Sequence, residues 1–361
     1  MKNRKVIIAA GGTGGHIIPA ISIAKELMKE GTQILFVGNS NSMEQKLAKK
    51  HEIDFAEINV QKFYRKLTFA HFKFPFKLIK SIIDSKKIIR KFKPDAFLGT
   101  GGFVSGPVGY AAHLLKVPIF LQEQNSYPGA TTKILSRYAT KIFLGNHDAK
   151  KHLLPKIAVY SGNPINLNVV TEKDTIDFDK LGLKAESKKI FLFGGSQGSV
   201  VLNNAFFPII DDILKRGFEI IWQIGSYSFN EFYHKVKDRN GVYTFDFTNE
   251  IGKIYNSVDL AIARAGALSL AELETKKIPA ILIPLPSAAE NHQYYNALEL
   301  KEKNVADIIE QKDLDPVILK DTIFKMLDKI DEINSNFSST VHANAAKNIA
   351  GTIMNYFAKG D

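Results

Sequence analysis

The stretch IIAAGGTGGH (residues 7–16) passes from an apolar strand through a glycine turn into a helix. The second half of the chain repeats this order in FLFGGSQGS (residues 191–199). Strand-like and helix-like patterns alternate along the rest of the chain, which is typical of parallel sheets covered by helices. The sequence therefore predicts an α/β protein with two doubly wound, Rossmann-like domains.

The expected strands form two series: 5–10, 33–37, 95–98, 117–121 and 141–144, then 189–193, 219–223, 242–245, 260–263 and 280–283. Expected helices include residues 17–29, 130–138, 202–215, 267–276 and 292–301. Pro164 and the polar residues after it place the linker near residues 163–170. We therefore predict an N-terminal domain over residues 1–164 and a C-terminal domain over residues 165–342. A last helix, at about residues 343–357, can pack back on the first domain.

A chain of 361 residues suits two α/β domains better than one compact core. It contains no cysteine, which excludes disulfides, thiolate nucleophiles and cysteine-based metal sites, and which fits a reducing compartment. The apolar run Val6–Ala10 is too short for the core of a signal peptide and is interpreted as the first strand. No run reaches the roughly 18 apolar residues that span a bilayer, so we expect a soluble or peripheral protein.

The net charge of +11 has a local origin. Residues 62–93 hold eleven lysines and arginines against the single acid Asp84. A helix over about residues 75–92 would align Ile79, Ile82, Ile83 and Ile89 on one stripe. Apolar side chains beside cations suit an anionic membrane, where each cation contributes about 1 kcal/mol. The predicted membrane patch comprises Phe69, Phe72, Lys73, Phe76, Lys77, Ile79, Lys80 and Ile83.

This basic segment has two alternative interpretations. One is an ordinary amphipathic helix with its apolar stripe in the core and its lysines in water. The other is an RNA-binding platform, but the glycine motifs of the common RNA-binding folds are absent. We therefore expect an anionic membrane surface as its partner and no nucleic acid.

Four glycine-rich turns follow predicted strands, at residues 11–15, 99–102, 194–198 and 264–266. Glycine lets a backbone approach a phosphate closely, and the helix that follows offers N–H groups and a positive dipole end. Such turns bind anions without a metal, although any tight strand-to-helix turn also uses glycine. None is a P-loop, and none is GxGxxG with an acid ending the second strand, so a nicotinamide dehydrogenase is disfavoured.

Seven motifs occur in order: GGTGGH (11–16), GTGGFVSGP (99–107), QEQN (122–125), GNP (162–164), GGSQG (194–198), RAGALSLAE (264–272) and ENHQYYNA (290–297). Together they resemble the MurG family, the N-acetylglucosaminyltransferases of bacterial peptidoglycan synthesis. The resemblance implies the GT-B fold, in which two Rossmann-like domains face each other across a cleft. It also implies an inverting transfer of N-acetylglucosamine from UDP-N-acetylglucosamine to the C4 hydroxyl of the muramoyl sugar of lipid I, which gives lipid II.

The same resemblance implies a peripheral enzyme on the cytoplasmic face of the cell membrane, with no cofactor and no obligatory metal. Lipid I would bind the N-terminal domain and UDP-N-acetylglucosamine the C-terminal domain. Other cell-wall synthesis proteins are expected partners, and the activity would serve cell-wall biogenesis, cell division and cell shape. The residues agree with this division of labour, because anion-type turns occur in both halves and the basic segment falls in the first.

Predicted contacts of the sugar donor follow from the matched motifs. Glu272 would hold the ribose diol, and the first N–H groups after Gly266 would hold the diphosphate. The resemblance adds His292, Gln293 and Asn125 as contacts of the transferred sugar. The complete set is Thr13, Gly14, Gly15, Asn125, Asn166, Ser196, Thr248, Ala267, Leu268, Ser269, Leu270, Ala271, Glu272, His292 and Gln293. The predicted acceptor and diphosphate loops contain Gly12, Thr13, Gly14, Gly15, Gly101 and Gly102.

His16, at a helix start, is the candidate base that removes the proton of the acceptor hydroxyl. A helix N-terminus disfavours imidazolium, so His16 should be neutral. Glu123 is the rival base, and His16 could instead be a capping or acceptor-binding residue. Plain alternatives also exist for Glu272, as an acid at a helix start, and for Ser196, as a turn serine.

One position departs from the family pattern. The family often carries arginine shortly after GNP, where this chain has Asn166, which cannot make a charged contact with the nucleotide. Alternative functions are another GT-B enzyme, such as a lipid glycosyltransferase or a UDP-N-acetylglucosamine 2-epimerase, and a non-catalytic lipid- or phosphate-binding protein. Turnover of a lipid I analogue to a disaccharide product separates the prediction from these alternatives.

Overall fold

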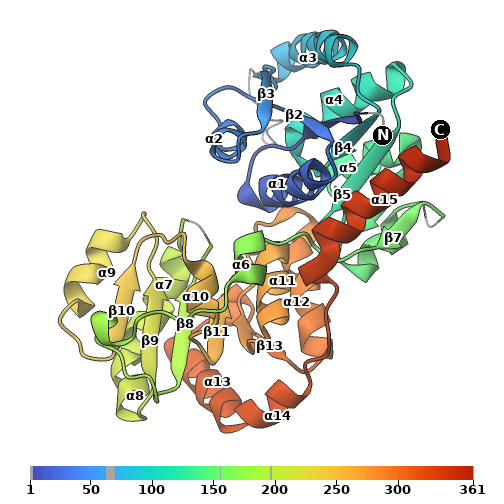
Figure 1. Ribbon diagram of the computed structural model, residues 1–361. Coiled ribbons are helices and arrows are strands. Elements are labelled where there is room, and N and C mark those ends of the chain that lie inside the picture. The colour runs from blue at the N-terminus through green and yellow to red at the C-terminus, as the bar shows by residue number, and fades with distance from the viewer. Residues whose placement is uncertain (1–2, 62–69, 155, 196, 361) are drawn as a thin grey trace. The chain divides into compact units, whose positions relative to one another are not determined.

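The computed structural model describes residues 3–61, 70–154, 156–195 and 197–360 (Figure 1). The chain divides into two compact units, one of residues 1–166 with 341–361 and the other of residues 167–340. Each unit is built on one parallel sheet, so the predicted α/β class with two doubly wound units is confirmed. The first unit extends two residues beyond Pro164, and the chain returns to it at Val341.

The first unit contains, in its described part, a seven-stranded sheet in the order β3-β2-β1-β4-β5-β6-β7. The strands are β1 (Lys5–Ala9), β2 (Gln33–Gly38), β3 (Asp54–Glu57), β4 (Ala96–Gly99), β5 (Ile119–Glu123), β6 (Lys141–Leu144) and β7 (Ala158–Tyr160). Strand order reverses between β1 and β4, which pair directly. The turns after these two strands therefore meet at one edge, where ligands bind in open parallel sheets.

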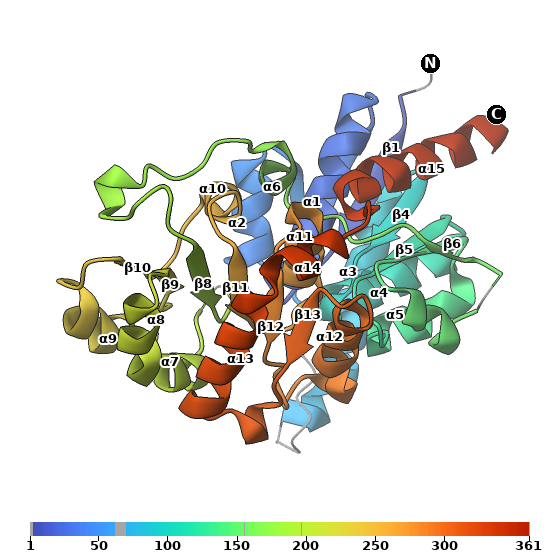
Figure 2. The same ribbon diagram turned by 90° about the horizontal axis from the view of Figure 1, so that it is seen from below.

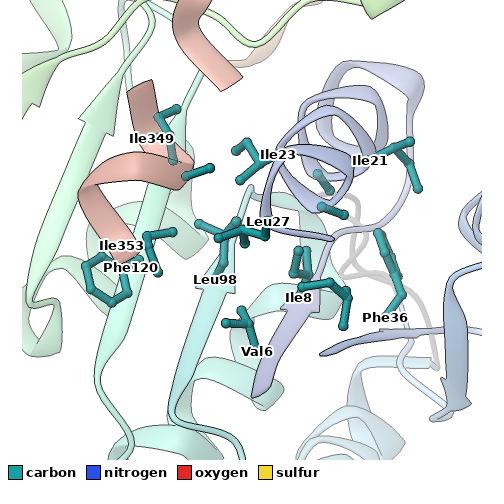
Figure 3. Packing of buried hydrophobic residues seen from close by; sticks show 14 of the residues in the cluster. Val6, Ile8, Ile21, Ile23, Leu27, Phe36, Leu98, Phe120, Ile349 and Ile353 are labelled. Carbon is teal, nitrogen blue, oxygen red and sulfur yellow. The ribbon is translucent and has the colours of Figure 1, made fainter. Parts of the chain in front are cut away.

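Helices cover both faces of this sheet: α1 (Gly14–Lys29), α2 (Met43–Lys50), α3 (Ala70–Phe92), α4 (Gly102–Leu114), α5 (Ala130–Leu135) and α15 (Ala345–Gly360). One face carries α1 and α15, and the other carries α3, α4 and α5. Figure 3 shows Ile349 and Ile353 of α15 close to Leu27 of α1 and Leu98 of β4. Burying such side chains stabilises the fold by about 1.5–3 kcal/mol each. The C-terminal helix is therefore part of the core of the first unit.

The second unit contains, among the described residues, a six-stranded sheet in the order β10-β9-β8-β11-β12-β13, which Figure 2 shows from below. The strands are β8 (Lys189–Phe193), β9 (Glu219–Gln223), β10 (Val242–Phe245), β11 (Leu260–Ala263), β12 (Ala280–Leu282) and β13 (Ala306–Ile308). Its helices are α6 (Leu167–Thr171), α7 (Val200–Phe206), α8 (Ile210–Lys215), α9 (Phe229–Val236), α10 (Ile251–Tyr255), α11 (Ala267–Lys276), α12 (His292–Glu302), α13 (Pro316–Asp328) and α14 (Ile330–Ser335). Here the order reverses between β8 and β11.

Three strands were not expected from the sequence: β3, β7 and β13. All three lie at sheet edges and have only three or four residues, too few to show a period. The single helix expected over residues 202–215 is two helices, separated by a 3₁₀ turn at Phe207–Ile209. Pro208 lies in that turn and has no N–H to continue the α-helical bonds.

The prediction for the basic helix α3 needs a correction. Ile79 and Ile83 are 56% and 49% exposed, whereas Ile89 is 3% exposed, so they do not share one stripe. The most buried positions, Ser81, Ser85 and Ile89, are four residues apart and face the sheet. Small serines allow close packing there. Because serine is not apolar, the spacing of apolar residues does not reveal this buried face.

Candidate functional site

The turn between β1 and α1 carries the first predicted loop. Thr13 precedes the helix with an extended backbone and without a side-chain cap, and α1 begins at Gly14. The first N–H groups of a helix have no partner within it, so Gly14 and Gly15 open an anion-type site. Gly12, Thr13 and Gly15 are exposed, as a ligand-facing turn requires.

The turn between β4 and α4 packs against His16, which lies in the first turn of α1. The Thr100 hydroxyl donates a 2.7 Å hydrogen bond to the His16 carbonyl oxygen. Gly101 has φ +99°, and a Cβ atom there would lie 2.7 Å from His16 Nδ1. A Cβ atom on Gly102 would meet the backbone oxygen of Gly11. The two turns therefore fit together only because these positions are glycine.

His16 is half-buried, and its Nδ1 lies 2.9 Å from Oε1 of Gln124. Gln124 follows β5 directly and is 3% exposed. The structure thus brings together the candidate base and a residue from the QEQN motif to which the sequence assigned no role. The sequence feature that could have identified Gln124 is its position: a polar residue at the end of a central strand, next to the switch point.

Glu123, the rival base, belongs to the other face of the sheet. Along β5, Phe120 packs in the cluster of α1 and α15, whereas Leu121 packs in the cluster of α4 and α5. Side chains alternate along a strand, so Glu123 lies on the side of Leu121 and Gln124 on the side of Phe120. The Glu123 carboxylate is 2% exposed and accepts hydrogen bonds from the backbone N–H groups of Asn125 and Gly129, at 3.2 and 3.1 Å.

In the second unit, α11 begins at Ala267, after Gly266, without a side-chain cap. The Leu270 N–H donates to the Gly266 carbonyl at 3.0 Å, so the N–H groups of residues 267–269 precede the first helical bond. Leu270 and Ala271 are 4% and 2% exposed and pack inward. The N–H groups of residues 267–269 are therefore placed for an anion, whereas the side chains of Leu270 and Ala271 pack inward. Donor contacts of Leu270 and Ala271 stay a prediction.

Glu272 is held by a tyrosine that the sequence analysis missed. The Tyr255 hydroxyl, from α10, donates a 3.1 Å hydrogen bond to Glu272 Oε2. Tyr255 is 3% exposed, and its burial together with the neighbouring Glu272 raises the pKa of the phenol well above its usual 10. The phenol therefore stays protonated and remains a donor to the carboxylate.

Arg264, at the end of β11, is a second residue that the sequence analysis left without a role. Its guanidinium donates to the Ile283 carbonyl at 3.1 Å, to Ser199 Oγ at 3.0 Å and to Gln311 Oε1 at 2.7 Å. Burial lowers the pKa of Arg264 to about 10, so the group is still charged at neutral pH. These acceptors are carbonyl, hydroxyl and amide oxygens, so none of them carries a charge that would neutralise the guanidinium. Arg264 thus brings positive charge to the switch point of the second unit.

The next two predicted residues, His292 and Gln293, are the first two of α12, and their side chains contact the preceding turn. His292 Nδ1 lies 2.7 Å from the Ala289 carbonyl, and Gln293 Oε1 accepts from the Leu285 N–H at 2.9 Å. Thr248 lies after β10, where its hydroxyl accepts from the Glu250 N–H at 3.0 Å. Where the structure describes the chain, no three His, Asp or Glu side chains are arranged to hold a metal ion.

Some of the remaining predicted residues lie in the part of the chain that the structure describes, and others do not. Asn125 and Asn166 belong to the first unit. Ser196 and Phe69 lie outside the described residues, and so do the side chains of Phe72 and Lys73. The other members of the predicted membrane patch, Phe76, Lys77, Ile79, Lys80 and Ile83, are all exposed. Over the described residues no helix combines the length and the apolar character needed to cross a bilayer.

Comparison with known proteins gives a consistent family. Residues 6–144 match the glycosyltransferase family 28 N-terminal domain, and residues 189–353 match the corresponding C-terminal domain. The chain is similar to the UDP-N-acetylglucosamine–N-acetylmuramyl-(pentapeptide) pyrophosphoryl-undecaprenol N-acetylglucosamine transferase of Bacillus pumilus. Identity is 34%, over 92% of this chain and 91% of that protein. The enzyme of the same name from Clostridioides difficile is 36% identical over 90% of this chain and 81% of its own length.

Solved structures show the same relationship. The crystal structure of Acinetobacter baumannii MurG superposes with a TM-score of 0.76 at 28% identity, covering 98% of this chain and 99% of that one. A UDP-GlcNAc 2-epimerase from Neisseria meningitidis has a TM-score of 0.70 at 16% identity, covering 97% of this chain and 100% of that one, a likeness of fold alone. The chain is therefore a glycosyltransferase, and it belongs to the MurG family of UDP-N-acetylglucosamine-dependent transferases within glycosyltransferase family 28.

Proposed function

We propose that this chain transfers N-acetylglucosamine from UDP-N-acetylglucosamine to the C4 hydroxyl of the muramoyl sugar of lipid I, with inversion, to give lipid II. The observation that carries the proposal is the relationship to transferases of that name over nine-tenths of the chain. The sites support it, because both units present an anion-type helix start at their switch points.

In the proposed reaction, the acceptor oxygen forms a bond to C1 of the sugar while the bond from C1 to the diphosphate breaks. His16 takes the proton of the acceptor hydroxyl, since it is a half-buried imidazole at the switch point of the first unit. Glu123 is less suited, because it is buried and already accepts bonds from two backbone N–H groups. UDP leaves with the electron pair of the broken bond.

The second unit binds the sugar donor in this proposal. Glu272 accepts hydrogen bonds from the ribose diol and is oriented by Tyr255. The first N–H groups of α11 and the charge of Arg264 stabilise the diphosphate as its negative charge grows. These groups do the work that a cation does elsewhere, so we propose that no metal or other cofactor is required. Activity should survive EDTA, and its loss on chelation would contradict this point.

We further propose that the enzyme associates peripherally with the cytoplasmic face of the cell membrane. Lipid I lies in the membrane, so the acceptor must be reached from its surface. The support for this step is α3, where Phe76, Ile79 and Ile83 are exposed beside Lys77 and Lys80. Apolar side chains beside cations bind anionic lipid surfaces. Partners among the other enzymes of cell-wall synthesis are part of the same proposal.

The decisive experiment is turnover. Purified full-length protein is incubated with UDP-N-acetylglucosamine and a lipid I analogue, and a disaccharide product and UDP are measured in equal amounts. Formation of UDP-N-acetylmannosamine, or of UDP and N-acetylmannosamine when water also cleaves the C1–O bond, without transfer would instead indicate epimerase chemistry. Binding of UDP-N-acetylglucosamine without any product would indicate a non-catalytic binding protein.

Two variants separate the candidate bases. His16→Ala should lower kcat by about 10²–10⁴-fold, the usual contribution of a general base, with a nearly unchanged KM for UDP-N-acetylglucosamine. Glu123→Gln keeps the shape of the buried carboxylate and should lower kcat much less. The reverse order of effects would assign the proton transfer to Glu123.

A further inference from the structure

A partly buried hydrogen bond decides which nitrogen of His16 is basic. Gln124 Oε1 lies 2.9 Å from His16 Nδ1. A neutral imidazole donates from one nitrogen and accepts at the other, and a carboxamide donates only from its nitrogen and accepts only at its oxygen. The tautomer of His16 therefore follows from which end of the Gln124 amide faces the ring.

The backbone of the β4–α4 turn orients this amide. Gln124 Nε2 donates to the Thr100 carbonyl oxygen at 2.8 Å. A carbonyl oxygen only accepts, so the NH₂ end of Gln124 must face Thr100. The oxygen end of the amide is then turned toward His16, whose Nδ1 must carry the proton.

A second, independent contact gives the same orientation. Asn163 Nδ2 donates to the backbone oxygen of Gln124 at 3.0 Å, so Asn163 Oδ1 accepts from Gln122 Nε2 at 3.2 Å. The oxygen of Gln122 is then left to accept from Gln124 Nε2. Reversing any one of these amides would bring two donors or two acceptors together in a site where all three residues are at most 3% exposed.

The far end of this chain of amides is also anchored. The Asn163 backbone N–H donates to His342 Nδ1 at 2.8 Å, and His342 is 4% exposed. Asn163 and His342 lie close in sequence to the two points where the chain passes between the units. The orientation of Gln124 is thus set by two backbone oxygens, those of Thr100 and of Gln124 itself, and the His342 contact holds the Asn163 backbone in place.

We propose that Gln124 is a positioning residue that holds His16 as the Nδ1–H tautomer, which leaves Nε2 as the basic nitrogen. The inference rests on the proposed role of His16 as the base. During transfer, Nε2 takes the proton of the acceptor hydroxyl, and the Nδ1–H bond to Gln124 is retained and strengthened by the new charge. A neutral amide orients the ring without the attraction by which a carboxylate would favour the charged form beforehand.

The first test needs no variant of Gln124. Full-length protein labelled with ¹⁵N-histidine is examined by NMR at about pH 8, above the ordinary pKa of histidine. The His16 signals among the nine histidines are identified by their loss in His16→Asn. We expect a protonated-type shift at Nδ1 and an unprotonated-type shift at Nε2. A proton on Nε2 of the neutral ring overturns the proposal.

The second test compares three variants. Gln124→Met removes the acceptor and should lower kcat by about 10- to 100-fold, the range known for losing the outer partner of a metal-bound histidine, with the KM for UDP-N-acetylglucosamine unchanged. Gln124→Glu keeps an oxygen at Nδ1 but loses the NH₂ group that donates to the Thr100 carbonyl and to Gln122, so it should retain the Nδ1–H tautomer and recover only a small part of kcat. Gln33→Met, at the exposed start of β2, is the control and should behave as wild type.

The outcomes separate this inference from the proposed base. If His16→Ala keeps normal kcat, the base assignment fails, whatever the tautomer. If His16→Ala loses kcat but Gln124→Met keeps both kcat and the Nδ1–H tautomer, only the positioning role of Gln124 fails. Should Gln124→Met not fold, the wild-type spectrum decides.

Discussion

At the scale of single residues, two proposed functional side chains, His16 and Glu272, are held by partners from other elements. Gln124 contacts the His16 ring from the end of β5, and Tyr255 contacts the Glu272 carboxylate from α10. Both partners are at most 3% exposed, so they hold their positions at little further cost in conformational entropy. Chemistry at these sites therefore depends on residues that need not touch a substrate.

Gly101 should be intolerant of even one added carbon. In Gly101→Ala the new Cβ would lie 2.7 Å from His16 Nδ1, so the ring must move. We expect kcat to fall at least about tenfold, because the base is displaced, with little change in the KM for UDP-N-acetylglucosamine.

Gly31→Ala is the matched control for this change. Gly31 also has a positive φ, of +75°, but a Cβ atom there meets no heavy atom within 4 Å. It places an alanine at positive φ without the collision, whereas Gly101, with φ +99° and ψ −173°, adds a backbone strain of about 1–3 kcal/mol of its own. Equal kcat values in the two alanine variants would contradict the predicted contact with His16.

Tyr255 should make stability depend on pH in the alkaline range. Its pKa is raised in the folded state by burial and by Glu272, so the unfolded chain releases the phenolic proton near pH 10 while the folded chain retains it. The stabilising effect is complete below pH 10 and is lost as pH rises above it, by about 1.4 kcal/mol per pH unit.

Tyr255→Phe lacks this titration. Its free energy of unfolding should therefore fall less steeply than that of the wild type between about pH 10 and 11, measured by urea denaturation. Parallel slopes for the two proteins would show that the phenol titrates normally. The same variant should raise the KM for UDP-N-acetylglucosamine, since Glu272 loses its partner.

At the scale of elements, α3 presents two faces of different use. Ser85 and Ile89 are buried, whereas Phe76 is 76% exposed and continues into Ile79 and Ile83 at helical spacing. Large apolar side chains gathered beside lysines are unusual for a purely solvated face. One face of the helix therefore packs in the core, and the other exposes large apolar side chains beside lysines.

Replacing two exposed side chains, Ile79→Ser with Ile83→Ser, should weaken binding to vesicles that contain anionic lipid. Inserting one such side chain contributes about 1.5–3 kcal/mol, so we expect at least a tenfold loss for the pair, measured by vesicle co-sedimentation. Lys77→Glu with Lys80→Glu should weaken binding further at low salt than at high salt. Val317→Ser with Ile318→Ser, also exposed at 58% and 46% but on α13, is the control. Unchanged binding of the Ile79/Ile83 variant would return α3 to a structural role.

At the scale of the whole molecule, the last helix belongs to the first unit although it follows the second in sequence (Figure 1). Ile353 of α15 is fully buried, and Ile353→Ala should destabilise the first unit by about 2–5 kcal/mol. The only tryptophan, Trp222, is fully buried in the second unit and reports on that unit. We expect the far-UV circular dichroism transition to begin at lower denaturant, with the Trp222 fluorescence midpoint unchanged.

Ile213→Ala provides the reciprocal measurement. Ile213 is fully buried in the core of the second unit, so this variant should move the Trp222 fluorescence midpoint to lower denaturant. If both variants shift both signals together, the units unfold as one cooperative block, and the expected separation is wrong.

Local patterns were sufficient for the fold class and for most strands. Lys141–Leu144, Lys189–Phe193 and Leu260–Ala263 fall on the predicted residues, because buried parallel strands are short apolar runs bounded by turns. Glycine turns also marked both switch points. Two turns can pack this closely only where no side chain separates their backbones, and this requirement is visible in the sequence as glycine. The family resemblance then connected these turns with a chemistry.

Contacts between elements distant in sequence were decided only by the tertiary structure. Gln124 meets His16 from 108 positions away, and Tyr255 meets Glu272 from another helix. The buried face of α3, with serines in place of isoleucines, likewise depends on what packs against it. Sequence periodicity reports which side chains share a face, but which neighbour that face meets depends on strand order and on the close packing of side chains in three dimensions.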